Sequence, residues 1–206
     1  MEVKAGPCVL GSNALTCRPL QRIQRGVGAD VMERILVALD GSTHSNRALD
    51  LATDLAEKYQ AELLLVHVMP TAPLDESERH MAAVEYADEL SSWAKDWNEA
   101  RSGEQSPSAP ELLLRYGDLA SRFRELVAKR LMSSAESKLQ GRQLSSTESI
   151  LQTGDPAKAI LDLAESRKVD TIVIGSRGLG EISGLLLGSV SHKVNQLANC
   201  ICITVK

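Results

Sequence analysis

The sequence predicts an α/β fold in which a parallel sheet carries helices on both faces. Short aliphatic and β-branched runs of the kind buried in parallel sheets occur at 34–40, 63–68 and 171–174. Segments with apolar residues at helical spacing separate these runs, and alternation of strands and helices is typical of a parallel sheet. Right-handed crossovers then place helices on both faces, and ligands bind outside the carboxyl ends of the strands.

Two helices have recognisable start signals. The first is predicted to begin at Ser42 or Thr43, because either hydroxyl can cap its amino end. Its apolar face consists of Ala48, Ala52, Leu55, Ala56 and Tyr59. A later helix has Asp155 as its expected N-cap and Pro156 in its first turn. The predicted buried stripe of that helix consists of Ala157, Ile160, Leu161 and Ala164.

The central region, about 70–145, is longer than a strand crossover needs and is predicted to be a helical insertion. Two helices are expected there, at about 76–100 and 119–139, followed by a strand near 147–152. Their apolar stripes either pack on the sheet or a second subunit, or belong to a mobile lid or a partner-docking hairpin. Both interpretations stay open at this point.

Composition is that of one domain with a substantial core, since 43% of the 206 residues are hydrophobic. A net charge of −4 and an aromatic content of 3% argue against nucleic acid as the main partner. No apolar run approaches the ~20 residues of a membrane span, and the four cysteines do not form a dense disulfide framework. We therefore expect a cytoplasmic protein.

The first 31 residues differ from the rest of the chain. They contain no continuous apolar core of the kind a signal peptide uses. The sequence therefore predicts a disordered N-terminal extension at 1–31 and one folded domain at 32–206, with a targeting role for the extension as the alternative.

A glycine-spaced segment follows the strand at 171–174 and precedes a helical pattern. Gly175, Gly178 and Gly188 can expose backbone N–H groups without obstruction by a Cβ atom, and Ser189 can cap the following helix. The positive dipole end of that helix would favour an anion, so the segment suits a polyphosphate. It matches neither the P-loop, which needs a lysine before the hydroxyl residue, nor the dinucleotide fingerprint, whose glycine order differs.

The pattern of glycine, two residues, glycine, nine residues, glycine and serine resembles that of the universal stress protein family, specifically its ATP-binding branch. The strand at 34–40 with its turn into Gly41, the strand at 63–68 and the block at 154–178 are also similar to that family. The resemblance implies a five-stranded parallel sheet in the order 3-2-1-4-5, within a Rossmann-like three-layer sandwich. The winding direction then reverses between strands 1 and 4, where Asp40 and Gly175 would face one another.

The resemblance also implies a nucleotide site. The candidate binding residues are Ala38, Asp40, Val68, Ile174, Gly175, Arg177, Gly178, Gly188, Ser189 and Val190. Asp40 would contact ribose hydroxyls or a hydrated Mg²⁺, Val68 and Ala38 the adenine, and the glycine segment the ribose and phosphates. Structural alternatives exist: Asp40 can form an Asx turn, Val68 and Ala38 can be plain core, and Arg177 can be solvated.

The implied function is an ATP-binding, nucleotide-responsive regulator of a stress response, with Mg²⁺ accompanying ATP. The resemblance implies a homodimer paired through the strand at 200–205 and a regulatory client that the sequence does not identify. Slow ATP hydrolysis is the most catalysis expected, because no general base stands out near the glycine segment and the scattered histidines predict no metal site. An ATP-using transferase of related architecture and a nucleotide-independent scaffold dimer are the alternatives.

Overall fold

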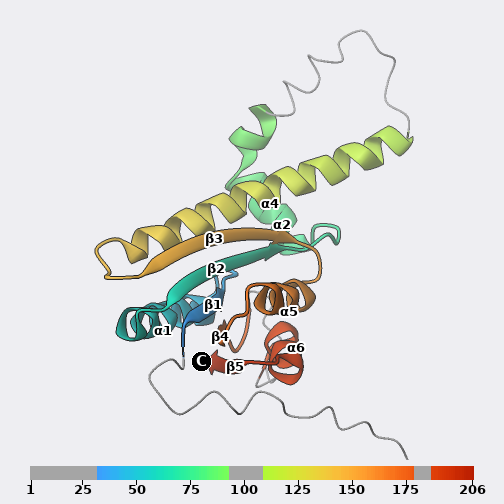
Figure 1. Cartoon of the computed structure of the whole chain (residues 1–206). Helices are drawn as coiled ribbons and strands as arrows, with labels where there is room; N and C mark the ends of the chain where they lie inside the picture. Colours follow the sequence, from blue (N-terminus) through green and yellow to red (C-terminus); the bar gives the residue numbers. More distant parts are fainter. Residues whose placement is uncertain (1–31, 93–108, 179–186) are drawn as a thin grey trace, which may run out of the picture. The chain divides into compact units, whose positions relative to one another are not determined.

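The computed structural model describes residues 32–92, 109–178 and 187–206, without the side chains of 77 and 109–115. Five parallel strands form one sheet in these residues (Figure 1): β1 Arg34–Ala38, β2 Glu62–Met69, β3 Ser146–Thr153, β4 Thr171–Gly175 and β5 Ile201–Val205. Their order is β3-β2-β1-β4-β5. This order confirms the predicted α/β fold and the predicted sheet.

Burial along the strands follows their position in the sheet. β1 and β4 are central and almost wholly buried, which explains their continuous apolar sequences. In β1, Ile35 and Val37 belong to the core cluster on one face, whereas Leu36 and Ala38 belong to the cluster on the other. β3 forms an edge of the sheet, and its residues alternate between exposed and half-buried.

Helices cover both faces of the sheet, as predicted (Figure 1). The cluster on one face includes residues of α1 Thr43–Tyr59 and of the carboxyl-terminal part of α4 Ala109–Leu139. The cluster on the other face includes residues of α5 Pro156–Ser166 and α6 Ser189–Leu197. The result is the expected three-layer arrangement.

The predicted start signals of α1 and α5 are confirmed. The Ser42 side chain accepts a hydrogen bond from the Ser45 N–H at 3.1 Å, and Asp155 caps α5 by accepting from the Lys158 N–H at 2.9 Å. Pro156 occupies the first turn of α5. Each cap satisfies a backbone donor that has no partner within its helix.

The predicted apolar faces of these helices needed two corrections. In α5, Leu163 is buried, whereas Leu161 is only half-buried and lies at the side of the stripe. In α1, Leu49 is buried, but Tyr59 is 45% exposed. Tyr59 is the last residue of α1, and its ring packs under the Lys58 Nζ at 5.7 Å instead of entering the core.

The insertion also differs from the prediction. The helix expected at 76–100 is broken: α2 Glu76–Val84 ends with Glu85 as its C-cap, and a second helical segment occupies 87–92. The break allows Tyr86 to place its ring edge-on against Phe123, with centroids 5.4 Å apart. The remainder of the predicted helix, 93–100, lies outside the described residues.

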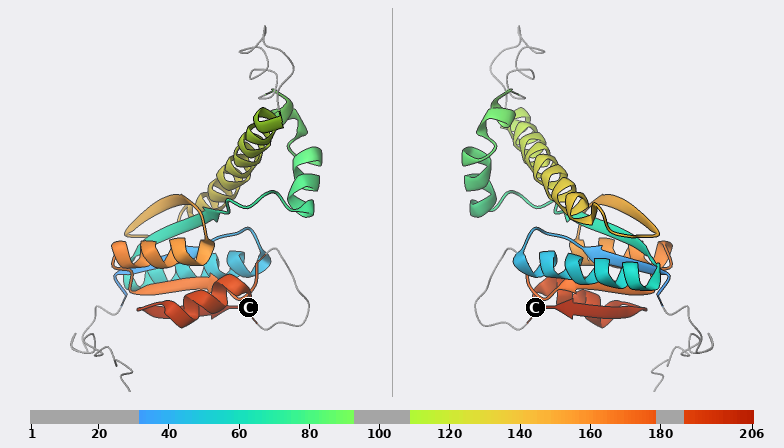
Figure 2. Two further views of the ribbon diagram at one scale, coloured as in Figure 1. Left: turned by 90° about the vertical axis from the view of Figure 1, so that its right-hand side faces the viewer. Right: turned by 90° about the vertical axis from the view of Figure 1, so that its left-hand side faces the viewer.

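α4 begins at Ala109, well before the predicted start at Leu119. Gly117 lies inside the helix and does not end it, because a single interior glycine costs only about 1 kcal/mol relative to alanine. The carboxyl-terminal part of α4 packs on the sheet through Met132 and Ala135. The preceding part packs against the α2 region through Phe123 and extends past the sheet (Figure 2). Part of the insertion therefore covers the sheet.

Candidate functional site

Asp40 and Gly178 meet at the carboxyl ends of β1 and β4. Asp40 follows β1, and its Oδ1 accepts a hydrogen bond from the Ser42 N–H at 2.9 Å. A Cβ atom on Gly178 would lie 2.5 Å from Asp40 Oδ2, so the glycine backbone approaches the carboxylate directly. The Asx turn that the sequence offered as the structural role of Asp40 is therefore present, while Oδ2 faces the glycine segment.

Serine side chains anchor the glycine segment to both neighbouring helices. The Ser42 hydroxyl donates to the Arg177 carbonyl at 3.2 Å. The Ser176 carbonyl accepts from the Gly188 N–H at 2.7 Å and from the Ser191 hydroxyl at 2.9 Å. Ser42, Ser176 and Ser191 are all buried. These contacts join the end of β4 to the starts of α1 and α6.

The sequence did not single out Ser176 and Ser191 for this role. Ser176 is 1% exposed and its N–H donates to the Val205 carbonyl at 2.6 Å, which also ties the segment to the end of β5. Ser191 lies one turn into a helix, where a serine carries no particular local signal. In the sequence, the one signal for this contact was that Ser191 is polar although it lies on the core-facing side of the predicted helix, two residues after Ser189.

The start of α6 corrects the predicted cap. Gly188, not Ser189, is the N-cap residue, and it makes no side-chain capping hydrogen bond. Ser189 is the first residue of the helix, so its hydroxyl does not have the position of a cap. The Gly188 N–H is donated to Ser176 O and is not an open donor. The N–H groups of Ser189 and Val190 belong to the first turn, where a helix supplies no acceptor.

Gly175 is required because a side chain at this position would collide with α1, not because its N–H group must face a ligand. A Cβ atom at this position would lie 2.8 Å from both the His44 carbonyl carbon and the Ser45 nitrogen. The end of β4 therefore passes directly under the first turn of α1. Arg177 is half-buried, and its carbonyl accepts the bond from Ser42. The residues 179–186 of the glycine segment lie outside the described residues.

Three candidate residues come together on one face of the sheet. Ala38, Val68 and Ile174 belong to the same buried cluster, and Ala38 pairs with Ile174 in the sheet register. Their exposed fractions are 9%, 9% and 5%. A core role is therefore established for all three, and a contact with adenine or ribose stays a prediction.

Among the described residues, two histidines lie near the site. His67 Nδ1 lies 2.8 Å from the Leu39 carbonyl, beside Asp40 but engaged with the backbone. His44 lies in the first turn of α1. Within 32–92, 109–178 and 187–206, no group of three or more His, Cys, Asp or Glu residues could hold a metal ion.

Comparison with known proteins places the chain in a family. The model of the universal stress protein family matches residues 32–206. The universal stress protein YxiE of Bacillus subtilis is 31% identical over 179 residues, which cover 85% of this chain and 100% of that protein. The chain belongs to the universal stress protein family.

Solved structures share the fold. The universal stress protein UspA from Lactobacillus plantarum aligns with a TM-score of 0.60 at 20% identity, covering 85% of this chain and 98% of that one. A universal stress protein solved in complex with cAMP aligns with a TM-score of 0.52 at 23% identity, covering 85% and 98%. None of the helices in the described part of the chain is both long and apolar enough to cross a membrane.

Proposed function

We propose that this protein binds ATP, accompanied by Mg²⁺, and acts as a nucleotide-responsive regulator of a stress response. The observation that carries the proposal is the uncapped amino end of α6 beside Asp40 and the glycine segment. α1, α2 and α5 each have a side-chain cap, whereas α6 begins at a glycine without one. A helix amino end with open N–H groups favours an anion such as a phosphate.

The residues present fit a nucleotide at this edge. Ser189 and Val190 would donate backbone N–H groups to phosphate oxygens, and Gly178 would border the phosphates on the side of Asp40. Gly188 would contribute its small size rather than its N–H, which Ser176 already accepts. Arg177 would reach a terminal phosphate from the loop.

The adenosine part would lie across β1, β2 and β4. Ile174 and Gly175 would line the ribose, and Ala38 and Val68 would border the adenine at the carboxyl ends of their strands. Asp40 Oδ2 would accept from the ribose hydroxyls or hold a hydrated Mg²⁺, with phosphate and water as further ligands. Support for a nucleotide comes from the protein of the same fold that was solved in complex with cAMP.

A homodimer paired through β5 belongs to the same proposal. β5 forms an edge of the sheet, pairs with β4 on one side, and leaves Ile201 45% exposed. An uncharged β-branched edge strand is an aggregation hazard unless it is covered. We expect a cytoplasmic protein that passes its nucleotide state to a client, with at most slow ATP hydrolysis.

Calorimetric titration with Mg-ATP tests the nucleotide site. Asp40→Ala should weaken binding by about 1 to 3 kcal/mol if the carboxylate makes a charge-assisted contact. Asp162→Ala is the matched control, because Asp162 is an exposed carboxylate on α5 that pairs with Lys158. Equal affinities of the two variants for Mg-ATP would show that Asp40 does not contact the nucleotide. If the unmodified chain binds no nucleotide, the result would favour the nucleotide-independent scaffold dimer.

The dimer is tested separately. Ile203→Pro removes a backbone donor from β5 and should distort pairing along the edge. Light scattering should then report monomer or aggregate. An intact dimer in this variant would show that the dimer interface does not include β5. Turnover measured with varied acceptor substrates distinguishes the regulator from an ATP-using transferase.

A further inference from the structure

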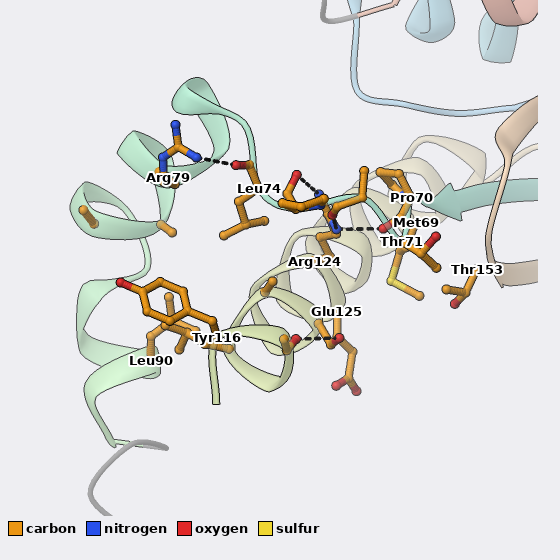
Figure 3. Close-up of a pocket in the computed structure, with 18 of the residues that line it drawn as sticks. Met69, Pro70, Thr71, Leu74, Arg79, Leu90, Tyr116, Arg124, Glu125 and Thr153 are labelled. Atoms are coloured by element: carbon orange, nitrogen blue, oxygen red, sulfur yellow. Dashed lines mark hydrogen bonds between the residues drawn. The ribbon is translucent and has the colours of Figure 1, made fainter. Parts of the chain in front are cut away.

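A cavity of about 1150 Å³ lies outside the candidate nucleotide site, between the loop that follows β2 and the helices of the insertion (Figure 3). Met69 at the end of β2 and the loop 70–74 form one wall, α2 and the segment 87–92 form the second, and α4 forms the third. Thr153, the last residue of β3, also lines it. The cavity is large enough for a small molecule, since such sites span about 300 to 1,000 Å³.

Small residues on facing helices create this space. Ala82, Ala83 and Ala87 line one side, and Gly117 and Ala120 line the side of α4. Larger apolar groups complete the walls: Met69, Leu74, Leu90, Tyr116 and Leu119. The lining is therefore mainly apolar, as expected for a site that binds the apolar body of a ligand.

Arg124 holds the walls together. It is 8% exposed, and its guanidinium donates to both carboxylate oxygens of Glu78, at 2.9 and 2.8 Å. It also donates to the carbonyls of Pro70 at 2.7 Å and Ala72 at 2.6 Å. One buried side chain thus joins α4, α2 and the loop after β2, so the cavity is bounded by a connected framework.

Among the charged residues that line the cavity, Arg79 makes no described contact with an acidic group. Arg124 is paired with Glu78, and Glu125 is paired with Arg122 and Lys129. Arg79 instead donates to a neutral group, the Leu74 carbonyl, at 2.6 Å. Figure 3 places Arg79 at the edge of the cavity beside Leu74, with Tyr116 and Leu90 below.

We infer that this cavity binds an apolar small molecule that carries a single anionic group, such as an aliphatic or aromatic carboxylate. The apolar body contacts the alanine-lined walls, and the anion pairs with Arg79. The cavity is unsuited to a triphosphate, which needs several donors, because Arg124 is already committed to Glu78 and to backbone carbonyls. This ligand is additional to the nucleotide and does not depend on it.

Two fluorescent probes with a shared aromatic framework test the inference on the full chain. Anilinonaphthalene sulfonate carries an anion, and N-phenylnaphthylamine is its neutral counterpart. Both should bind saturably, and an excess of ATP should displace neither. Displacement of the probes by ATP, or the absence of saturable binding, would overturn the proposal of a separate apolar site.

Gly117→Leu is designed to fill the cavity without disturbing the fold. A Cβ atom at Gly117 meets nothing within 4 Å, and leucine is a better helix former than glycine. The leucine side chain should displace part of each probe from the apolar walls. If each probe loses the burial of about two methylene-sized groups, its affinity should fall about tenfold. Ser134→Leu is the control, since it adds the same side chain at an exposed position of α4 that does not line the cavity. Equal affinities of the two variants would refute the assignment.

Arg79→Gln tests the anionic group. The exposed ion pair should contribute about two- to fivefold to the affinity of the sulfonate probe and nothing to that of the neutral probe. Arg47→Gln is the control, because Arg47 is a helical arginine that does not line the cavity. If Arg79→Gln weakens both probes equally, or neither, the inferred anionic class of ligand is wrong.

Discussion

Replacing Gly175 by alanine should destabilise the fold far more than replacing the other glycines of the same motif. The added Cβ would lie 2.8 Å from two backbone atoms of α1, one in His44 and one in Ser45, where contacts below 3.0 Å essentially never occur. Backbone atoms cannot rotate away as the end of a side chain can. Either β4 or the first turn of α1 must therefore move.

The magnitude follows from how firmly that turn is held. The Ser42 hydroxyl caps it and also donates to the Arg177 carbonyl, so a shift of α1 would strain both contacts. Overpacking in a well-packed core costs about 1 to 3 kcal/mol, and we expect Gly175→Ala to reach the upper end of that range. In a domain of this size, a loss of about 3 kcal/mol corresponds to a fall in Tm of roughly 6 to 12 °C.

Gly188→Ala and Gly178→Ala are the comparisons. A Cβ on Gly188 meets its nearest atoms at 3.5 Å, and the φ of −72° suits alanine, so the free energy of unfolding should change by less than about 0.5 kcal/mol. A Cβ on Gly178 meets Asp40 Oδ2 at 2.5 Å, a side-chain atom that can move. Gly178→Ala should therefore leave folding largely intact and weaken nucleotide binding instead.

Urea denaturation followed by circular dichroism, performed on the full chain, measures the free energy of unfolding of all three variants. The expected order of destabilisation is Gly175→Ala, then Gly178→Ala, then Gly188→Ala. A Gly175→Ala variant as stable as Gly188→Ala would show that the close contact between β4 and α1 does not exist in solution, and the reasoning would fail.

Arg124→Met should lower the free energy of unfolding by about 3 kcal/mol, because Glu78 and the loop carbonyls lose their shared donor; a loss below 1 kcal/mol in urea titrations would contradict the clamp. Asp155→Ala should cost about 1 kcal/mol through the lost cap of α5, and Asp155→Asn should restore most of it in the same assay. The hydrogen bond with the Cys200 thiol lowers the pKa of Cys202, so alkylation of Cys202 should begin at a lower pH than in Cys200→Ala. Unchanged pH profiles in the two proteins would exclude that hydrogen bond.

Much of the fold was predictable because its signals are local. The apolar runs at 34–40, 63–68 and 171–174 are the buried centre of the sheet, and the caps at Ser42 and Asp155 act on backbone N–H groups three residues away. The strand order, by contrast, came from the resemblance to a family rather than from the residues. The structure confirms it.

The errors arose where distant contacts outweigh local preference. The first part of the helix expected at 76–100 ends at Val84, and Tyr86, in the break, packs its ring on Phe123 of another helix. Periodicity alone favoured Leu161 over Leu163 in α5, but the position of the neighbouring strands decides which side chain is buried. Ser189 was a plausible cap from its residue type, yet hydrogen bonds from Gly188 and Ser191 to Ser176 set where α6 begins.

The sequence by itself determined that this chain is an α/β protein with a glycine segment after its fourth strand, because periodicity, capping and glycine spacing are encoded in neighbouring residues. Only the tertiary structure decided which residues cap α6 and which donors are engaged: the Gly188 N–H donates to the Ser176 carbonyl, and the N-cap Gly188 makes no side-chain capping hydrogen bond. It alone also located the cavity lined by Arg124, whose partner Glu78 stands 46 positions away in the sequence. Such contacts depend on how elements pack, and no local pattern specifies them.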